Sequence, residues 1–400
     1  MTKLEQLIKE LCPNGVEYKK LGEVATISRG GSFQKKDFCE DGVPCIHYGQ
    51  IYTRYGLFAD KTLTFISEDA AKKQKYAVKN DIVMAVTSEN IDDVCKCVAW
   101  LGDDEIAVSG HTAIIHHTLN PKYLCYYFHT AMFYAQKKKL AHGTKVIEVT
   151  PDKLADIAIP VPPLEVQAEI VKILDNFTEL TAELTAELTA RKKQYEYYKQ
   201  QILPLYSQVK TVRLEEISDI IDSLHKTPKY SDFGYSMIRV QDVKNGYIIA
   251  DDTLKVDKET FDEFVKKYKP QIGDIVVSRV GSYGNFAIIN DDNCCLGQNV
   301  ALIHPRINIK YIFYFLNSSY TKSWIQNNVN GASQKSLSIA DIKRIPIPVP
   351  PIEEQERIVS ILDRFDKLCN DISEGLPAEI EARRKQYVYY RDKLLSFNEA

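Results

Sequence analysis

The sequence lacks the features that mark membrane proteins, secreted proteins and disulfide-rich proteins. No window of 18 apolar residues occurs in the 400 residues, so no segment is expected to span a bilayer. The charged, amphipathic stretch at residues 1–15 has no secretory hydrophobic region. The nine cysteines are scattered and odd in number, which fits reduced, buried thiols in a cytoplasm better than a disulfide framework or a zinc site.

The sequence motifs of self-contained enzymes are also missing. There is no Gly-x-x-x-x-Gly-Lys-Ser/Thr loop for ATP and no His-Glu-x-x-His zinc site. The Asn/Asp-Pro-Pro-Tyr/Phe signature of amino-methyltransferases is absent, and Pro151-Asp152 lacks a following Glu-x-Lys of the nuclease type. The adjacent His116 and His117 would face opposite sides of a strand, so they are not expected to share a metal. The sequence therefore predicts no catalytic residue, no metal site and no bound cofactor.

What the sequence does contain is a long internal repeat. Of the 27 residues at 154–180, 15 recur identically at 342–368, and seven of the nine residues at 190–198 recur at 382–390. The offset is 188 residues for the first pair and 192 for the second, far longer than a solenoid repeat. The repeat indicates two tandem modules, each with a variable part followed by a helix, and an internal pseudo-two-fold.

The repeated segments predict extended connectors followed by long helices. The Ile-Pro-Val-Pro-Pro runs at 159–163 and 347–351 cannot be helical or lie inside a sheet. A helix of about 40 residues should follow each run, and its apolar residues recur in steps of three and four. We expect the two helices to pack on each other in antiparallel orientation as a coiled coil, with Gly375 and Pro377 bending or splitting the second one. The tandem Thr-Ala-Glu-Leu units at 178–190 would change the length of the first helix in steps of one turn.

The predicted fold class is α+β, with two α+β domains separated by two long antiparallel helices. The predicted boundaries are 1–158 for the first variable domain, 159–206 for the first helix, 207–346 for the second variable domain and 347–400 for the second helix. Short β-like runs such as 81–86, 274–277 and 299–304 alternate with helical stretches such as 121–140 and 309–327. The repeat extends weakly into both domains, where residues 110–115 align with residues 297–302. Gly30-Gly31-Ser32 is expected to form a turn.

Each variable domain carries basic and polar residues that suit nucleic-acid contacts. The net charge of −3 does not by itself indicate such binding, which depends on local patches. Cations contact phosphates, whereas Arg, Gln, Asn, Ser and Thr can read base edges. Such residues at equivalent places in the two modules could contact two different half-sites; variable surface is the alternative explanation. The predicted DNA-contacting residues are Lys35, Lys36, His47, Gln50, His111, Thr112, Thr144, Lys145, Arg239, Gln241, Arg279, Gln298, Asn299, Ser333, Gln334 and Lys335.

The repeated motifs resemble those of the specificity (S) subunits of type I restriction-modification enzymes. The resemblance rests on Ile-Pro-Val-Pro-Pro-(Leu/Ile)-Glu-x-Gln at 159–167 and 347–355 and on Ile-Val-x-Ile-Leu-Asp at 170–175 and 358–363. Arg-(Lys/Arg)-Lys-Gln-Tyr-x-Tyr-Tyr at 191–198 and 383–390 adds to it. The similarity covers essentially the whole chain, in the family's order of target-recognition domain, helix, target-recognition domain, helix.

The resemblance implies a non-catalytic chain that gives a DNA-methylating host-defence complex its sequence specificity. Each recognition domain would bind one half of a bipartite double-stranded DNA site. The helix pair would set the gap and dock two methylation (M) subunits, and restriction (R) subunits would join for translocation and cleavage. S-adenosylmethionine, ATP and Mg²⁺ are expected on those partner subunits, in a bacterial or archaeal cytoplasm and not at a membrane. The alternative is a helical scaffold that holds two protein-binding domains and does not bind DNA.

Overall fold

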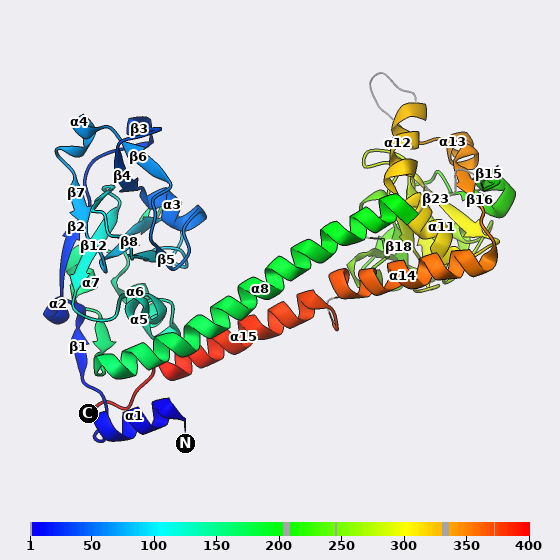
Figure 1. Cartoon of the computed structure of the whole chain (residues 1–400). Coiled ribbons are helices and arrows are strands. Elements are labelled where there is room, and N and C mark those ends of the chain that lie inside the picture. Colours follow the sequence, from blue (N-terminus) through cyan, green and yellow to red (C-terminus); the bar gives the residue numbers. More distant parts are fainter. Residues whose placement is uncertain (1, 203–208, 245, 330–335, 372) are drawn as a thin grey trace. The chain divides into compact units, whose positions relative to one another are not determined.

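The chain forms two compact units, each with a mixed α/β domain and segments of long helix (Figure 1). The computed structural model describes residues 2–202, 209–244, 246–329, 336–371 and 373–400. Unit 1 comprises Met1–Thr185 and Glu379–Ala400, and unit 2 comprises Ala186–Ala378. The α+β class, the doubled architecture and the long helices are confirmed. The finer boundaries at 158, 206 and 346 stay a prediction.

The strands of unit 1 form two five-stranded sheets and two short pairs. Their bounds are β1 (Tyr18–Lys20), β2 (Ala25–Arg29), β3 (Phe38–Cys39), β4 (Val43–Ile46), β5 (Phe58–Ala59), β6 (Thr64–Ile66), β7 (Lys75–Ala77), β8 (Ile82–Ala85), β9 (Thr87–Ser88), β10 (Cys97–Trp100), β11 (Ile106–Val108), β12 (Thr112–His117), β13 (Ile147–Glu148) and β14 (Ala158–Pro160). One sheet has the order β2-β12-β8-β10-β5 and the other β3-β6-β4-β11-β7. Strand β1 pairs with β14, and β13 pairs with β9.

The central strands of unit 1 are apolar on both faces because each face packs against a different layer. Ile82 and Met84 of β8 belong to the core shared with the helices. Val83 and Ala85 belong to the core between the two sheets. A strand that is covered on both sides reads as a continuous apolar run rather than an alternating one, which is why 81–86 was recognisable from sequence.

Several helices of unit 1 begin at polar residues whose side chains cap them. The bounds of the helices of this unit are α1 (Lys3–Leu11), α2 (Leu21–Val24), η1 (Lys35–Asp37), α3 (Tyr48–Thr53), α4 (Glu68–Ala71), α5 (Pro121–Tyr127), α6 (Ala131–Leu140) and α7 (Pro151–Ala155). The helical stretch predicted at 121–140 is two helices. Asn120 caps α5, and the Thr130 side chain accepts from the backbone of Phe133 to start α6.

Unit 2 repeats this arrangement with smaller sheets, of order β16-β23-β20-β21 and β17-β19-β18-β22. Its strands are β15 (Thr211–Arg213), β16 (Ser218–Asp222), β17 (Tyr230–Ser231), β18 (Tyr235–Ile238), β19 (Leu254–Val256), β20 (Ile275–Ser278), β21 (Phe286–Ile288), β22 (Cys294–Leu296), β23 (Val300–Pro305) and β24 (Pro346–Pro348). Its helices are α9 (Leu214–Ile217), η3 (Val240–Asp242), η4 (Ala250–Asp252), α10 (Lys258–Phe264), α11 (Ile309–Leu316), α12 (Ser319–Asn328) and α13 (Ile339–Arg344). The proline runs contribute short edge strands, since β24 pairs with β15 as β14 does with β1.

Strand register corrects one equivalence drawn from the sequence. Ala113 pairs with Met84 in unit 1, and Ala301 pairs with Val277 in unit 2. These pairings align β12 with β23 at an offset of 188, whereas the sequence alignment of 110–115 with 297–302 used 187. His111 therefore corresponds to Asn299, not to Gln298, and the predicted alignment was wrong by one residue. A one-residue slip changes the face on which every side chain lies.

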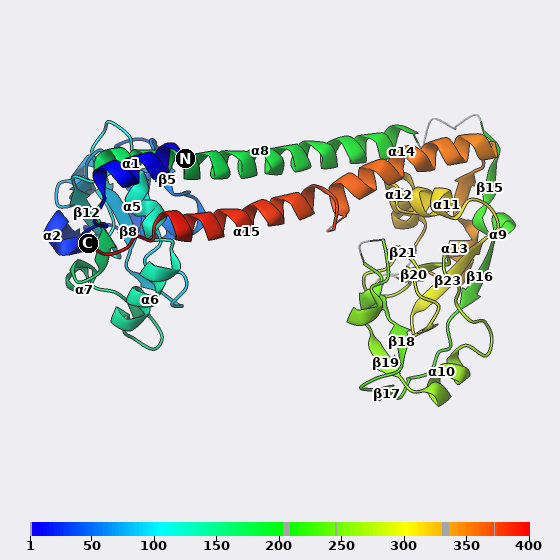
Figure 2. The ribbon, with the colours of Figure 1, turned by 90° about the horizontal axis from the view of Figure 1, so that it is seen from below.

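The long helices are α8 (Leu164–Ile202), α14 (Ile352–Asn370) and α15 (Leu376–Leu394). The first part of α8 runs antiparallel to α15 in unit 1, and its last part runs antiparallel to α14 in unit 2 (Figures 1 and 2). Ring contacts join each pair of helices. The ring centres of Phe177 and Tyr390 lie 5.5 Å apart, and those of Phe365 and Tyr198 lie 5.2 Å apart. The predicted split of the second helix is confirmed, because α14 ends at Asn370 and α15 begins at Leu376.

The repeated polar residues attach each variable domain to its helix. In unit 1, Asp175 of α8 accepts hydrogen bonds from Lys122 Nζ and Tyr126 Oη, both at 2.7 Å. In unit 2, Asp363 of α14 accepts from Lys310 Nζ and Tyr314 Oη, both at 2.6 Å. The repeat is therefore preserved where the domain and the helix meet.

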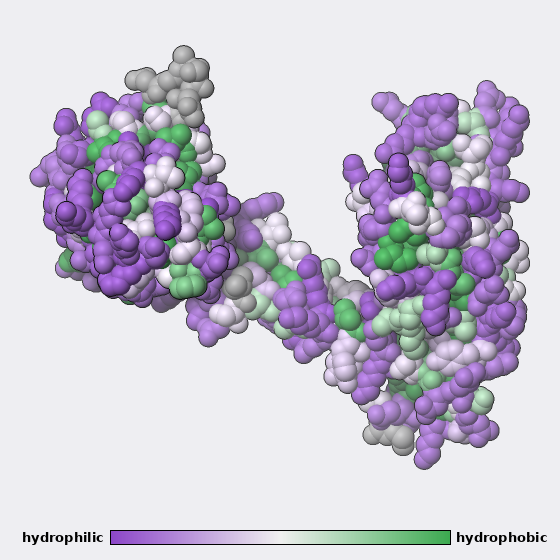
Figure 3. Space-filling view, turned by 180° about the vertical axis from the view of Figure 1, so that it is seen from behind, coloured by the Kyte–Doolittle hydropathy of each residue, from purple (hydrophilic) through white to green (hydrophobic). Residues whose placement is uncertain are grey.

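The surface seen in Figure 3 is mostly hydrophilic, with small hydrophobic patches on both units. Among the described residues, no helix has both the length and the apolar character needed to cross a membrane. Eight of the nine cysteines are buried free thiols, and Cys39 is half-buried.

Candidate nucleic-acid interface

A basic cleft of about 840 Å³ opens on unit 1 where several loops meet. Its walls come from the end of β2, the chain that follows it, the start of α3, the start of β7 with the segment before it, and the turn before β12. The lining residues are Arg29, Gly30, Gly31, Ser32, Phe33, Gln34, Lys35, His47, Tyr48, Lys73, Lys75, Ser109, Gly110 and His111. The structure thus brings together three of the predicted contact residues, which come from three separate segments of the sequence: Lys35, His47 and His111.

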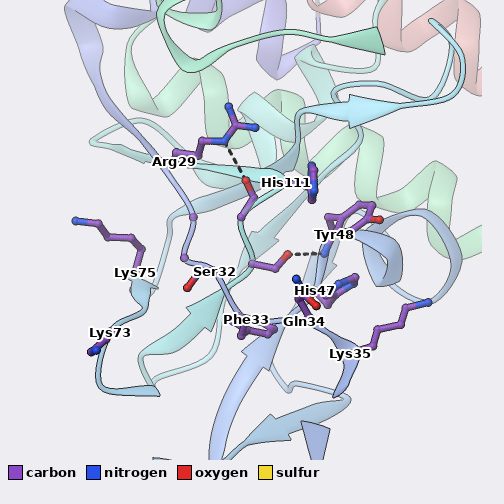
Figure 4. Close-up of a pocket in the computed structure, with 14 residues that line it drawn as sticks. Arg29, Ser32, Phe33, Gln34, Lys35, His47, Tyr48, Lys73, Lys75 and His111 are labelled. Carbon is purple, nitrogen blue, oxygen red and sulfur yellow. Dashed lines mark hydrogen bonds between the residues drawn. The ribbon is translucent and has the colours of Figure 1, made fainter. Parts of the chain in front are cut away.

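Cations lie on both sides of this cleft. In the view of Figure 4, Lys73 and Lys75 are at one edge and Lys35 is at the other. All three side chains are exposed. Arg29 is held in place, because its Nε donates to the carbonyl of Gly110 at 3.0 Å and its NH1 lies 2.7 Å from Glu148 Oε1. Exposed lysines around a concave surface are suited to an extended polyanion.

Aromatic and imidazole rings line the side of the cleft nearest Lys35 (Figure 4). The ring centres of His47 and Tyr48 lie 4.5 Å apart, and the ring centres of Tyr48 and His111 lie 4.9 Å apart. His47 is buried, and its Nδ1 accepts from the amide of Gly49 at 3.2 Å. Burial, with Lys35 and His111 nearby, lowers the pKa of His47 to about 4. His47 is therefore neutral at pH 7, while the exposed His111 shares a hydrogen bond with Thr87 Oγ1 at 3.1 Å.

The glycines in the cleft wall allow two backbone segments to approach closely. A methyl group at Gly30 would lie 2.1 Å from the carbonyl oxygen of Ser109, and one at Gly110 would lie 2.5 Å from that of Gly31. Residues 30–34 have no turn, so the predicted turn at Gly30-Gly31-Ser32 was wrong. The segment is extended and bonded to both sheets, since Gly30 N donates to Thr112 O and Gly31 N donates to Val108 O.

Two predicted contacts of unit 1 are used inside the protein instead. Thr112 has no exposed surface, and its hydroxyl donates to the carbonyl of Ser109. Gln50 is half-buried; its Oε1 accepts from His47 N at 3.0 Å and its Nε2 donates to Thr64 Oγ1 at 3.2 Å. Both ends of that amide are satisfied by local partners, so neither side chain is available to a ligand here.

The other predicted residues of unit 1 lie outside the lining of this cleft. Lys36, Thr144 and Lys145 are exposed. The last two belong to the loop before β13, in which Gly143 has φ +107°. The Arg29–Glu148 ion pair joins β13, which follows this loop, to the cleft wall.

The equivalent position of unit 2, at the end of β16 and beyond α10, carries a cleft of about 740 Å³. His225, Lys266 and Lys267 line it, together with Asp222 and Glu263. Two lysines of each cleft come from corresponding segments, after α4 in unit 1 and after α10 in unit 2. The other residues that line the two clefts differ in identity and number.

Arg239 and Gln241 of unit 2 line a separate cleft of about 420 Å³ with Lys244 and Tyr247. Arg239 follows β18 as His47 follows β4. Its Nε and NH2 donate to Asp242 at 3.0 Å each, so the guanidinium is held in one orientation. Gln241 is exposed.

The remaining predicted residues of unit 2 divide into structural and partly exposed ones. Arg279 is mostly buried and structural; it pairs with Asp222, and its Nε donates to Leu337 O at 3.1 Å. Gln298 and Asn299 are half-exposed. Asn299 has φ +63°, and its carbonyl accepts from the amide of Arg279 at 2.9 Å. Ser333, Gln334 and Lys335 lie outside the described residues.

Sequence reasoning missed several cleft residues and a repeated ion pair. Arg29, Gln34 and Tyr48 were not singled out, and their role depends on loops that meet only in the folded chain. A repeated pair was detectable: His116 Nδ1 lies 2.6 Å from Asp81 Oδ1, and His304 lies 2.6 Å from Asp274 in the same way. Register-corrected alignment of the two modules would have shown both pairs. In the described ranges, no three His, Cys, Asp or Glu side chains gather as metal ligands would.

A family model for the type I restriction modification DNA specificity domain matches residues 13–191 and, a second time, residues 206–382. The chain belongs to this family. Together the two matches cover most of the chain, with one match in each of its two modules.

Two relatives of this chain support the same family. A Haemophilus influenzae protein assigned as a type I restriction enzyme specificity subunit is 31% identical over 423 aligned residues, covering 99% of each chain. The specificity subunit of the Escherichia coli enzymes EcoR124I and EcoR124II is 35% identical over 255 residues, which cover 60% of this chain and 63% of that one. The chain is thus a type I specificity subunit.

Solved structures share the fold at lower identity. The HsdS subunit from Thermoanaerobacter tengcongensis aligns with a TM-score of 0.55 and 18% identity over 96% of each chain. A chain from a study of complex assembly in a type I R-M system aligns with a TM-score of 0.66 and 17% identity, over 96% of this chain and 98% of that one.

Proposed function

We propose that this specificity subunit binds double-stranded DNA through its two variable domains, each of which contacts one half of a bipartite site. The observation that carries the proposal is a repeated scaffold with different side chains at equivalent positions. His47 and Arg239 follow equivalent strands, and His111 and Asn299 occupy equivalent places before β12 and β23. Different side chains on equivalent backbone suit two half-sites of different sequence.

The basic clefts supply the affinity in this proposal. Phosphate contacts from lysine and arginine position a protein on DNA, and polar groups at base edges give the sequence preference. Lys35, Lys73 and Lys75 of unit 1 are exposed around one cleft. Lys266 and Lys267 line the corresponding cleft of unit 2. The affinity of each domain should therefore fall steeply with salt.

The long helices dock two methylation subunits and fix the gap between the half-sites. Restriction subunits complete the assembly, and this chain contributes specificity rather than catalysis. S-adenosylmethionine, ATP and Mg²⁺ bind to those partner subunits. The paired helix segments and the duplicated domains support this division of roles.

The decisive experiment is methylome sequencing of a host that expresses this chain together with its methylation subunit. We expect one bipartite motif with methylated adenine in both halves, which also gives the two sequences and the gap. An assembled complex that methylates no motif would favour the scaffold that does not bind DNA. Binding of a scrambled duplex as tight as that of the cognate duplex would favour it too.

The gap can be tested separately from the half-sites. Deleting residues 181–184 removes one Thr-Ala-Glu-Leu unit and about one turn, or about 6 Å, of α8. We expect both half-sequences to stay the same while the gap shortens. Exchanging residues 1–150 for those of another family member should change one half-sequence only, and a change in both would contradict independent domains.

A further inference from the structure

The residue that follows strand β4 or strand β18 is held by the same contact in both units. In unit 1, the backbone amide of His47 donates to Gln50 Oε1 at 3.0 Å. In unit 2, the backbone amide of Arg239 donates to Asp242 Oδ2 at 2.8 Å. Both residues line clefts, and both follow a strand that has a parallel neighbour. The fold therefore presents an imidazole at this position in one unit and a guanidinium in the other.

In unit 2 the same carboxylate also orients the side chain. Arg239 Nε donates to Asp242 Oδ2 and Arg239 NH2 donates to Asp242 Oδ1, both at 3.0 Å. The side chain of Asp242 is 9% exposed and that of Arg239 is 21% exposed, so the pair is largely enclosed. The contact uses one edge of the planar guanidinium and leaves the edge between NH1 and NH2 for a further acceptor. An arginine that is already fixed loses little freedom when it binds a ligand.

The second edge of this guanidinium already binds a carbonyl oxygen. With the amide oxygen of Gln241 turned toward Arg239, that oxygen accepts from NH2 at 2.7 Å and from NH1 at 2.9 Å. The Gln241 side chain is exposed, so water can replace its contacts at little cost when it moves away. In the major groove, guanine presents the carbonyl oxygen O6 with the acceptor N7 beside it. These two atoms match the two donors that Gln241 occupies.

The charges in the cleft favour a base edge over a phosphate. The described lining residues include two cations, Arg239 and Lys244, and two anions, Asp242 and Asp252. A phosphate would be attracted by the first pair and repelled by the second, so it gains little net Coulomb energy there. The acceptor edge of guanine carries no net charge and gains the hydrogen bonds without this repulsion. Direct reading of a base therefore suits Arg239 better than contact with the DNA backbone.

We propose that Arg239 reads one guanine in the half-site of unit 2, with NH1 and NH2 donating to O6 and N7 in the major groove. Asp242 is the positioning residue that holds this edge of the guanidinium toward the base. The inference rests on the proposed function, in which unit 2 binds a DNA half-site. In unit 1, His47 Nδ1 accepts from the amide of Gly49 at 3.2 Å, so only Nε2 of the neutral ring can donate. The equivalent position of unit 1 therefore cannot make this two-point contact with guanine.

The test uses the full chain assembled with its methylation subunit, and duplexes that carry the bipartite motif found by methylome sequencing. Exchange of residues 1–150 shows which half belongs to unit 2, because that half stays unchanged. Each guanine in this half is then replaced in turn by 7-deazaguanine, which keeps the base pair but lacks the N7 acceptor. We expect one of these replacements to weaken binding of the wild-type complex about 10-fold, the loss typical of one hydrogen bond from a charged donor.

Substitutions of the arginine should remove this preference for guanine over 7-deazaguanine. Arg239→Ala lacks the donors, and Arg239→Lys keeps the charge but loses the planar fork, so both should bind the two duplexes within about twofold of each other. Arg239→Ala should also bind the unmodified duplex about 30-fold more weakly, and its methylome motif should accept other bases at that position. Asp242→Asn keeps an acceptor for the Arg239 amide but not the ionic contact, and should reduce the preference to about threefold or less.

A second cation of the same cleft provides the matched control. Lys244→Ala should lower the overall affinity and leave the preference for guanine intact. Circular dichroism and an unchanged half-sequence for unit 1 show that each variant is folded and assembled. A guanine preference that persists in both Arg239 variants, a loss of affinity that is uniform across sequences, or a half-site of unit 2 without guanine would overturn the inference alone. A wild-type complex that prefers no bipartite duplex would overturn the proposed function together with it.

Discussion

Two equivalent buried glutamines should differ in their importance for stability, because one is fully bonded and the other is not. Gln167 and Gln355 are 1% and 3% exposed at the start of α8 and α14. Gln167 Nε2 donates to Pro162 O at 2.7 Å, and its Oε1 accepts from Asn120 N at 2.9 Å. Gln355 Nε2 donates to Pro350 O at 2.8 Å, but its buried Oε1 has no partner among the described residues.

Replacing each glutamine by leucine keeps the volume and removes the hydrogen bonds. Gln167→Leu leaves a carbonyl and the amide of Asn120 unpaired, and each unpaired buried group costs about 1–3 kcal/mol. We therefore expect local destabilisation of about 2–4 kcal/mol in unit 1. Gln355→Leu leaves one carbonyl unpaired and removes an oxygen that is already unsatisfied, so we expect about 0–2 kcal/mol in unit 2.

Hydrogen exchange of the intact chain can measure the two effects separately. A loss of about 3 kcal/mol corresponds to about 150-fold faster exchange of the amides at the start of α5 when exchange follows local opening. The amides at the start of α11 should change about 30-fold or less in Gln355→Leu. Gln386→Leu, at an exposed position of α15, is the matched control. Equal effects in the two units, or a larger effect of Gln355→Leu, would refute the reasoning from hydrogen bonds.

Three further outcomes concern unit 1. Lys73→Ala and Lys75→Ala should each lower the slope of log affinity against log salt by about one in anisotropy titrations with duplex DNA; unchanged slopes would place them outside the interface. Gly30→Ala should destabilise unit 1 in denaturant unfolding, because its methyl group would lie 2.1 Å from a carbonyl oxygen. Burial lowers the pKa of His47 and His117 to about 4, below about 6.5 in the unfolded chain, so protons favour unfolding. Unit 1 should therefore lose stability as the pH falls from about 6.5 toward about 4, and constant hydrogen exchange of unit 1 between about pH 7 and about pH 5, corrected for intrinsic rates, would contradict this.

The helical part of the fold could be predicted because its determinants are local. Proline excludes helix at 159–163, and the apolar steps of three and four continue through α8 without interruption. The split at 371–375 was predictable for the same reason, since Gly375 and Pro377 act on their own backbone. Strands β8, β20 and β23 were also recognisable, because burial on both faces gives continuous apolar runs.

The sheet register and the cleft could not be predicted, because both depend on contacts between distant segments. Two weak similarities, one residue apart, match different residues around His111: one aligns Gly110 with Gly297, and the other aligns Ala113 with Ala301. The pairing of β12 with β8 and of β23 with β20 decides between them. Thr112 and His111 are neighbours, yet one is buried and the other exposed. Gln50 has a side chain suited to reading a base, but its amide donates a hydrogen bond to Thr64, which is distant in the sequence.

The contrast between repeated and variable positions favours two different half-sites over one sequence read twice. Asp175 and Asp363 make the same contacts in both units, so the domains are held on their helices in the same way. With that frame fixed, the residues that follow β4 and β18, His47 and Arg239, differ although the strands before them correspond. The two copies have diverged at these positions, whereas the residues that join domain to helix have stayed identical. Selection for one shared half-site would have kept the cleft residues as similar as the joining residues.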